Sequence, residues 1–185
     1  MTTANDKAYD KNLDRKCSPA ALAVSLRTCT AFGMTKPRKN SEDVWTGHIY
    51  DLVFDYFGKE VRVETELKRE WKEDWSRSIA DPDVPYRWPT MDVPYRKRDK
   101  GILHANWHHI VGGDGKRAFW APRKVVLSSP VSDKYCRNRQ CEEPFFNIPL
   151  PSPMTTFWEE VNGVWKITHH WGVDGTLKIR NGVVL

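Results

Sequence analysis

The sequence predicts an α+β domain in which antiparallel hairpins dominate and helices are few. One segment near the N-terminus has a helical composition, whereas short runs of β-branched and aromatic residues recur along the rest of the chain. Turns that contain Gly separate many of these runs. The length of 185 residues predicts one domain, residues 17–185, after a charged arm over residues 1–16. Residues 157–185 form a Trp-rich C-terminal extension of this domain in the prediction.

The composition narrows the functional classes. Nine Trp within 39% hydrophobic residues exclude a disordered chain, and no apolar run approaches the ~18 residues of a membrane helix. Four Cys are too sparse for a disulfide scaffold, and the N-terminus has no apolar stretch typical of a secretory signal. We therefore expect a reducing, cytoplasmic setting, or the interior of a host cell for a viral protein, and no membrane partner. The net charge of +5 and the pI near 9.0 favour an anionic partner.

The first predicted element is a short helix that starts at Ser18-Pro19 and extends to about Phe32. Ser at the N-cap and Pro at the first helical position are typical of a helix start, and Gly33 is a plausible stop. Residues 34–43 are basic and polar, which predicts a loop.

A β-hairpin is predicted next, from residues 50–57 and 61–68. The second run alternates, with Val61, Val63, Thr65 and Leu67 on one face and charged residues on the other. Gly58-Lys59 lies between the two runs and predicts the turn.

The remaining elements follow from composition and period. Residues 69–80 predict a short helix with two Trp on one side, and residues 81–101 predict an extended loop. Residues 102–111 and 117–120 predict a second hairpin, and residues 124–127 one more strand. Residues 128–156 show neither the helical nor the strand periodicity of apolar residues. Residues 157–184 predict short strands that are separated by turns at Asn162-Gly163, Asp174-Gly175 and Asn181-Gly182.

The first hairpin carries the most informative group of charges. With the turn at Gly58-Lys59, Phe57 faces Glu60, and the same register places Asp51 opposite Glu66. Lys68 follows two residues later and shares that face. Two opposed carboxylates would repel each other, and a divalent cation such as Mg²⁺ removes the repulsion. Such an ion polarises a phosphoryl oxygen and supplies hydroxide, while the lysine can act on the water or on developing charge.

An Asp at the start of one strand and Glu-x-Lys near the end of the next resemble the PD-(D/E)xK nuclease superfamily. The matching residues are Asp51 and Glu66-Leu67-Lys68, and the resemblance covers residues 45–70. It implies a restriction-endonuclease-like or resolvase-like mixed sheet and Mg²⁺-dependent hydrolysis of phosphodiester bonds, with Mn²⁺ as a substitute ion and DNA as the usual substrate. Asp51, Glu66 and the Leu67 carbonyl would then hold the metal, and Lys68 would be the catalytic lysine.

Some assignments within this pattern stay open. Asp55 is an alternative for the Asp role, although the predicted register places it opposite Arg62. Many members of the superfamily carry an acidic ligand on the first helix. The predicted helix has none, and Glu42 or Asp14 could take that place.

Two basic segments suit contacts with the phosphates of DNA. The cations are Lys36, Arg38, Lys39, Arg96, Lys97 and Arg98. Aromatic residues near them could stack on bases or sugars. A homodimer is an arrangement that the sequence leaves open.

Other residues have weaker metal-site patterns. His108-His109 resembles the opening of an HNH nuclease motif, but the required Asn and further His are missing at suitable spacing. Cys136 and Cys141 have a spacing within the range of zinc ligands, with Cys17 and Cys29 as the candidate second pair.

The alternative function is a non-enzymatic, basic, Trp-rich module that docks on nucleic acid or protein, as in a viral assembly.

Overall fold

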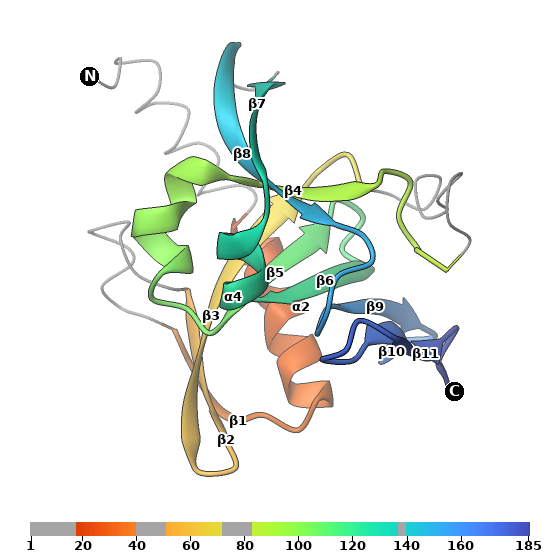
Figure 1. Cartoon of the computed structure of the whole chain (residues 1–185). Coiled ribbons are helices and arrows are strands. Elements are labelled where there is room, and N and C mark those ends of the chain that lie inside the picture. Colours follow the sequence, from red (N-terminus) through yellow and green to blue (C-terminus); the bar gives the residue numbers. More distant parts are fainter. Residues whose placement is uncertain (1–17, 40–50, 72–82, 137–139) are drawn as a thin grey trace.

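The computed structural model describes residues 18–39, 51–71, 83–136 and 140–185. In these ranges it has a large mixed sheet, a small second sheet and two α-helices, α2 (Ser18–Ala31) and α4 (Arg123–Ser128) (Figure 1). This confirms the predicted α+β class. The predicted arm and most of the predicted helix over 69–80 lie outside the described residues. Within the described ranges, neither helix is long and apolar enough to cross a membrane.

The large sheet contains nine strands. In spatial order they are β1 (Thr35–Lys39), β2 (Leu52–Tyr56), β3 (Lys59–Lys68), β5 (Trp107–Gly112), β6 (Arg117–Pro122), β9 (Thr156–Val161), β10 (Val164–Trp171), β11 (Leu177–Arg180) and β12 (Val183–Val184). Neighbours are antiparallel except β3 and β5, which run parallel. A parallel pair needs a crossover connection, and the chain from Lys68 to Trp107 makes it.

That crossover carries the elements that cover the middle of the sheet. It contains β4 (Thr90–Pro94), the 3₁₀-helix η2 (Tyr95–Lys97) and the π-helix η3 (Arg98–Ile102). Strand β4 pairs with β8 (Cys141–Pro149), which pairs with β7 (Val131–Cys136), and together they form the small sheet (Figure 1). The crossover thus brings basic residues 96–98 over the large sheet.

The large sheet has an apolar core on each face. On one face, Ala21, Val24 and Cys29 of α2 pack with sheet residues such as Val63 and Trp120. On the other face, the buried residues come from β5, β6 and β9, from the small sheet, from α4 and from the crossover that follows β3. They include Ile110, Phe119, Phe157, Trp71, Tyr86, Met91, Phe146, Ile148 and Val126. Strand β3 therefore lies between two layers, and its two faces have different surroundings.

Several predicted elements agree with the structure. The first helix covers Ser18–Ala31, and Gly33 after it has a φ of 93°, a left-handed conformation that suits glycine. Strands β5 and β6 form the second predicted hairpin. In the C-terminal hairpin of β9 and β10, Asn162 and Gly163 both have positive φ, as a type I′ turn requires.

Other predicted elements were wrong. Residues 35–39 form strand β1 instead of the predicted loop. The sequence did not indicate this strand because all five residues are exposed, so apolar and polar residues do not alternate along it. Residues 124–127 belong to helix α4 and not to the predicted strand. The prediction failed because a short apolar run has the same composition in a strand and in a buried helix. The segments 81–101 and 128–156 contain strands β4, β7 and β8, and β7 is largely exposed, so its sequence shows little periodicity.

Candidate active site

The β2–β3 hairpin has a different register from the predicted one. Phe57 and Gly58 form its turn with φ of 47° and 74°, so Tyr56 lies opposite Lys59. The register is shifted by two residues along β3. Asp51, just before β2, thereby comes level with Glu64 instead of Glu66. Asp55 lies opposite Glu60, not Arg62.

A two-residue shift leaves every side chain on its predicted face, because the side-chain period of a strand is two. Glu64, Glu66 and Lys68 therefore still alternate with Val63, Thr65 and Leu67. Asp51 is fixed at the open end of the hairpin. Its backbone N–H donates to the Val63 carbonyl at 2.9 Å, and its Oδ2 accepts a hydrogen bond from the Thr65 N–H at 2.6 Å.

Glu64 is the most buried acid of this face, with 9% of its side chain exposed. The Lys97 Nζ donates to Glu64 Oε1 at 2.9 Å and to the Thr65 carbonyl at 3.2 Å. Burial raises the pKa of Glu64, Lys97 opposes this, and the charge of Asp51 adds to it. Burial would lower the pKa of Lys97, but Glu64, Glu66 and Asp51 together hold it above its usual value. Lys97 is therefore a cation shared by three carboxylates.

Glu66 lies beside a buried histidine. Its Oε2 is 3.6 Å from His108 Nε2, and the His108 side chain is 1% exposed. Burial alone would raise the pKa of Glu66, but Lys97, followed by His108, holds it below its usual value. Among the described residues, neither Glu66 Oε2 nor either ring nitrogen of His108 has a hydrogen-bond partner. We call Asp51, Glu64, Glu66, Lys97 and His108 the acid cluster.

Lys68 and Leu67, both predicted site residues, lie at the end of the same strand. The Lys68 Nζ is 5.8 Å from the centre of the Tyr86 ring, a cation–π distance. The Leu67 side chain packs on the core beside α2. The ammonium within hydrogen-bond distance of Glu64 therefore belongs to Lys97, whereas Lys68 lies further along the face.

The donor set of the acid cluster suits a hard cation only in part. In the part of the chain that the structure describes, no three His, Cys, Asp or Glu are arranged around one ion position. Mg²⁺ needs only one or two protein carboxylates and completes its octahedron with water and phosphate. Glu66 Oε2 already lies 3.6 Å from His108 Nε2, and no complete cage is present among the described residues.

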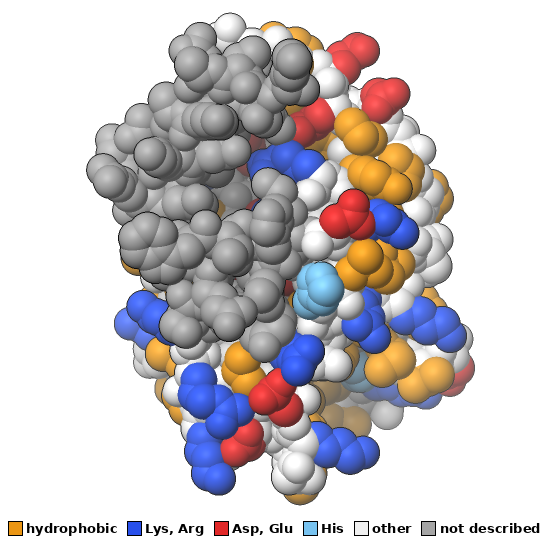
Figure 2. Space-filling view, turned by 90° about the vertical axis from the view of Figure 1, so that its left-hand side faces the viewer, with side chains coloured by type: hydrophobic (Ala, Val, Ile, Leu, Met, Phe, Trp, Pro, Cys, Tyr) orange, Lys and Arg blue, Asp and Glu red, His pale blue; other side chains and the backbone are white. Residues whose placement is uncertain are grey.

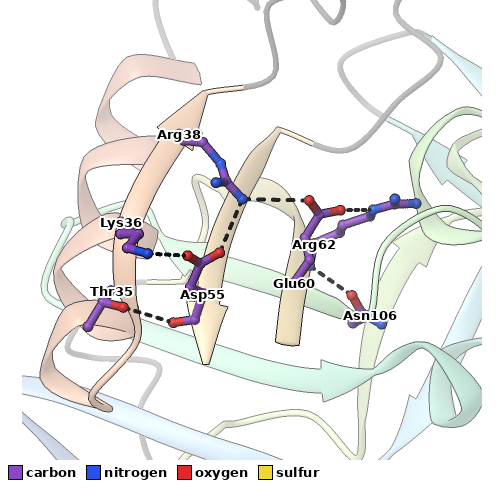
Figure 3. Close-up of polar contacts among 7 residues, drawn as sticks. All are labelled: Thr35, Lys36, Arg38, Asp55, Glu60, Arg62 and Asn106. Carbon is purple, nitrogen blue, oxygen red and sulfur yellow. Dashed lines mark hydrogen bonds and ion pairs between the residues drawn. The ribbon is translucent and has the colours of Figure 1, made fainter. Parts of the chain in front are cut away.

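The predicted phosphate contacts lie in exposed ion pairs. Lys36 and Arg38 both reach Asp55 at 3.3 Å, from β1 to β2 (Figure 3). Arg38 also lies 3.6 Å from Glu60, which binds Arg62 in turn. Lys39, the last residue of β1, is exposed.

The second basic segment also has acidic neighbours. Arg96 lies 3.5 Å from Glu143, and Arg98 lies 2.8 Å from Asp99. Basic and acidic side chains are interspersed on the described part of the face in Figure 2. Phosphate contact at these residues would therefore compete with existing carboxylate partners.

The weaker patterns have structural roles. His109 is buried, stacks on Trp120 with ring centres 4.3 Å apart, and its Nδ1 lies 3.2 Å from Ser25 Oγ. Cys136 lies opposite Cys141 in the β7–β8 hairpin, Cys29 is buried in α2, and Cys17 lies outside the described residues, as do Glu42 and Asp14. The C-terminal Trp residues are buried, namely Trp158, Trp165 and Trp171.

Sequence reasoning missed Glu64, Lys97 and His108 as members of the cluster. The predicted register, with Phe57 opposite Glu60, implies a pair of Val53 with Glu64, whereas Val53 in fact pairs with Arg62. Lys97 reaches Glu64 across 33 positions of sequence, and no local pattern marks that contact. The parallel pairing of β3 with β5 places His108 beside Glu64, and this pairing leaves no local pattern in the sequence.

Comparison with known proteins adds no assignment. No family model, no curated protein and no solved structure matches this chain.

Proposed function

We propose that the chain is a metal-dependent nuclease of the PD-(D/E)xK type that hydrolyses phosphodiester bonds, with DNA as its substrate and Mg²⁺ or Mn²⁺ as its ion. The observation that carries this proposal is the acid cluster. Asp51, Glu64 and Glu66 lie at the end of the β2–β3 hairpin, where the charge of Lys97 acts on all three carboxylates and the charge of Arg96 acts on Glu66. Carboxylate oxygens are the ligands that Mg²⁺ prefers, and a divalent cation near these three acids would offset part of their negative charge.

The proposed roles follow from the positions of the side chains. Asp51, Glu64 and Glu66 hold the ion, with the Leu67 carbonyl as a further proposed ligand. When bound, the ion supplies a polarised phosphoryl oxygen and a hydroxide near neutral pH. Lys68 lies on the same strand face as Glu66 and is proposed to act on the attacking water or on the charge of the transition state. Its ammonium lies over the Tyr86 ring, 5.8 Å from the ring centre.

The sheet gives further support. The large sheet is mixed, as the resemblance implies, and it carries α2 against one face and the acids on the other. The docking module has less support, because the C-terminal Trp residues that would form its surface belong to the core. Trp158 and Trp171, for example, are 3% and 2% exposed.

The test is cleavage of supercoiled plasmid and of branched DNA by the full chain. We expect nicking with Mg²⁺ or Mn²⁺ and none with EDTA. Asp51→Asn and Glu64→Gln should each lower the cleavage rate by at least ~10²-fold, the usual scale for losing an electrostatic group of an active site.

Glu60→Gln is the matched control, since Glu60 lies on the same strand and the same face but is 46% exposed and pairs with Arg62. Its cleavage rate should stay within a few-fold of the wild type. Metal-dependent cleavage that survives both cluster variants would show that the acid cluster is not the active site. No cleavage of any DNA by the folded wild type would remove the nuclease proposal.

A further inference from the structure

The turn of the β2–β3 hairpin places a large apolar side chain in solvent. Of the large apolar side chains that the structure describes, Phe57 is the most exposed, at 88%. In Figure 1 the hairpin extends below the rest of the described chain, so its turn is the far end of an arm. Phe57 therefore lies where a partner can reach it without any rearrangement of the fold.

The backbone of this turn is unfavourable for phenylalanine. Phe57 and Gly58 have φ of 47° and 74°, the left-handed pair of a type I′ turn. The first position of such a turn favours Asn, Asp or Gly, because a bulky side chain crowds the backbone at positive φ. The chain thus keeps a phenyl ring where both its exposure and its φ cost free energy. Residues held in such conformations cluster at functional sites, which points to a role for this ring outside the core.

Two further rings connect Phe57 to the core. The ring centres of Phe57 and Tyr56 are 4.5 Å apart, edge to face, and those of Tyr56 and Phe32 are 5.4 Å apart. Phe32 in turn lies 5.5 Å from the buried Trp120 ring. This row of rings supports Phe57 from one side, so a planar partner that stacks on it has little side-chain freedom left to remove.

The strands behind the turn carry exposed cations. Lys36 and Arg38 of β1 are 76% and 50% exposed, and both pair with Asp55 at 3.3 Å (Figure 3). Arg38 also lies 3.6 Å from Glu60, whose other partner is Arg62. Exposed ion pairs of this kind contribute little to stability, so the two cations of β1 can exchange a carboxylate for an external phosphate at small cost.

We propose that Phe57, Lys36 and Arg38, here called the aromatic tip, bind single-stranded DNA: an unpaired base stacks on the Phe57 ring, and the two cations contact the phosphates beside it. Exposed aromatic rings next to cations are the usual elements of single-strand binding, since every base has a face that can stack. The inference shares the DNA of the proposed function but needs neither its ion nor its cleavage reaction.

Other partners fit the aromatic tip less well. A stable protein interface covers about 800 Å² on each partner and has few Lys and Glu at its centre, whereas the tip is one ring among charges. A single ring is also too small to anchor a protein on a lipid membrane. The tip is separate from the acid cluster, because the five residues from Lys59 to Glu64 span roughly 17 Å of β3.

Fluorescence anisotropy with a labelled oligothymidylate strand tests the inference on the full chain. EDTA is present throughout, so neither a divalent ion nor cleavage contributes. Phe57→Asn installs a residue that the first position of a type I′ turn favours, so its Tm should equal or exceed that of the wild type. It should nevertheless bind the strand at least ~5-fold more weakly, the scale of losing one stacked base.

Matched variants separate the ring from general surface effects. Phe57→Trp keeps a ring and should bind within about two-fold of the wild type. Val173→Asn removes an apolar side chain that is 79% exposed outside the hairpin, and should bind as the wild type does. Lys36→Gln should flatten the log–log salt dependence of binding by ~0.7, the loss of one phosphate contact on a single strand.

Photocrosslinking of the wild type keeps the inference testable if Phe57→Asn does not fold. A strand that carries 5-bromouracil should crosslink to Phe57 or Tyr56, as peptide mass spectrometry would show. Binding by Phe57→Asn equal to the wild type, a crosslink only elsewhere, or an unchanged salt slope in Lys36→Gln would overturn the inference. So would Phe57-dependent binding to phosphatidylserine vesicles in place of DNA.

The outcome is distinct from that of the nuclease test. Ring-dependent strand binding without cleavage of any DNA would support the aromatic tip and reject the nuclease. Metal-dependent cleavage by a wild type that binds no single strand in EDTA would support the nuclease and reject the aromatic tip.

Discussion

Gly101 of η3 lies directly against the carboxylate of Glu64: a methyl group on Gly101 would overlap both carboxylate oxygens. The φ of Gly101 is not left-handed, so the requirement for glycine is one of space. Glu64 is therefore enclosed by η3 on one side and by Lys97 on another.

The contact predicts that Gly101→Ala displaces Glu64 and destabilises the fold by about 1–3 kcal/mol, the usual cost of overpacking. Urea unfolding measures this cost. In a Glu64→Ala background the same change should cost much less, since the methyl group then fills vacated space. Equal costs in the two backgrounds would show that the two residues are not coupled.

Lys68→Ala should separate catalysis from binding. The variant should fold and bind DNA within a few-fold of the wild type, while metal-dependent cleavage falls by at least ~10²-fold, because the proposed role concerns the transition state. Lys59→Ala, an exposed lysine of the same strand, is the control. A cleavage rate equal to that of Lys59→Ala would exclude Lys68 from the reaction and leave Lys97 as the ammonium to test.

The basic segment after β4 should contribute to the salt dependence of DNA binding. Replacing Arg96 and Arg98 together with Ala should flatten the log–log slope by ~0.9 for each lost phosphate contact. Lys97 is left in place, since its ammonium is held by Glu64. Lys166→Ala, an exposed change on β10, should leave the slope unaltered. If the double variant matches this control, Arg96 and Arg98 serve only their pairs with Glu143 and Asp99.

His109 predicts a loss of stability in mild acid. Burial, with a smaller effect of the His108 charge, holds the pKa of His109 well below the usual 6.5. Below pH 6.5 the unfolded chain therefore binds a proton that the folded chain does not, so stability is present above this pH and is lost as the pH falls, by up to about 1.4 kcal/mol per pH unit.

Thermal unfolding from pH 7.5 to 5 can measure this effect. His109→Phe keeps a ring on Trp120 and should show a smaller fall in Tm than the wild type. The other histidines are common to both proteins, so the difference reports His109. His104→Gln, at an exposed position, should follow the wild type. A profile of His109→Phe as steep as that of the wild type would contradict the prediction.

Cys136 and Cys141 should form a disulfide in the presence of oxidised glutathione. They are direct partners across the β7–β8 hairpin, and the Cα separation of such pairs lies within the disulfide range. Mass spectrometry should find a loss of two hydrogens within the tryptic peptides that contain them. Cys29 is the internal control, since it is buried and its thiol pKa is raised by burial. Stable glutathione adducts on both cysteines without a crosslink would show that they do not face each other.

The fold class could be predicted, and so could the strand face on which Glu64, Glu66 and Lys68 lie. Both depend only on the periodicity of apolar and polar residues along the sequence. The alternation in β3 fixed which side chains share a face, and a shift of two residues could not change it. The register itself depends on the turn. Phe57, 88% exposed with a positive φ, gives no sequence signal that it and Gly58 would form a type I′ turn.

The position of Lys97 could not be predicted for a different reason. Its segment is charged and contains Pro, which indicates a loop, whereas the structure turns it into η2 and η3 over the sheet. That placement depends on the parallel pairing of β3 with β5 and on packing against β8. Neither contact leaves a local pattern in the sequence.

Strand β1 has a consequence for solubility that does not depend on DNA. It is the first strand in the order of the large sheet, and its residues Lys36, Pro37, Arg38 and Lys39 are all exposed. Charges and proline on an outer strand oppose the addition of a strand from another molecule. At the other end of the order, β12 offers only Val183 and Val184, which are 63% and 77% exposed. The basic run thus acts as a gatekeeper against aggregation, and neutralising it would expose the longer of the two sheet edges to fibril-like growth.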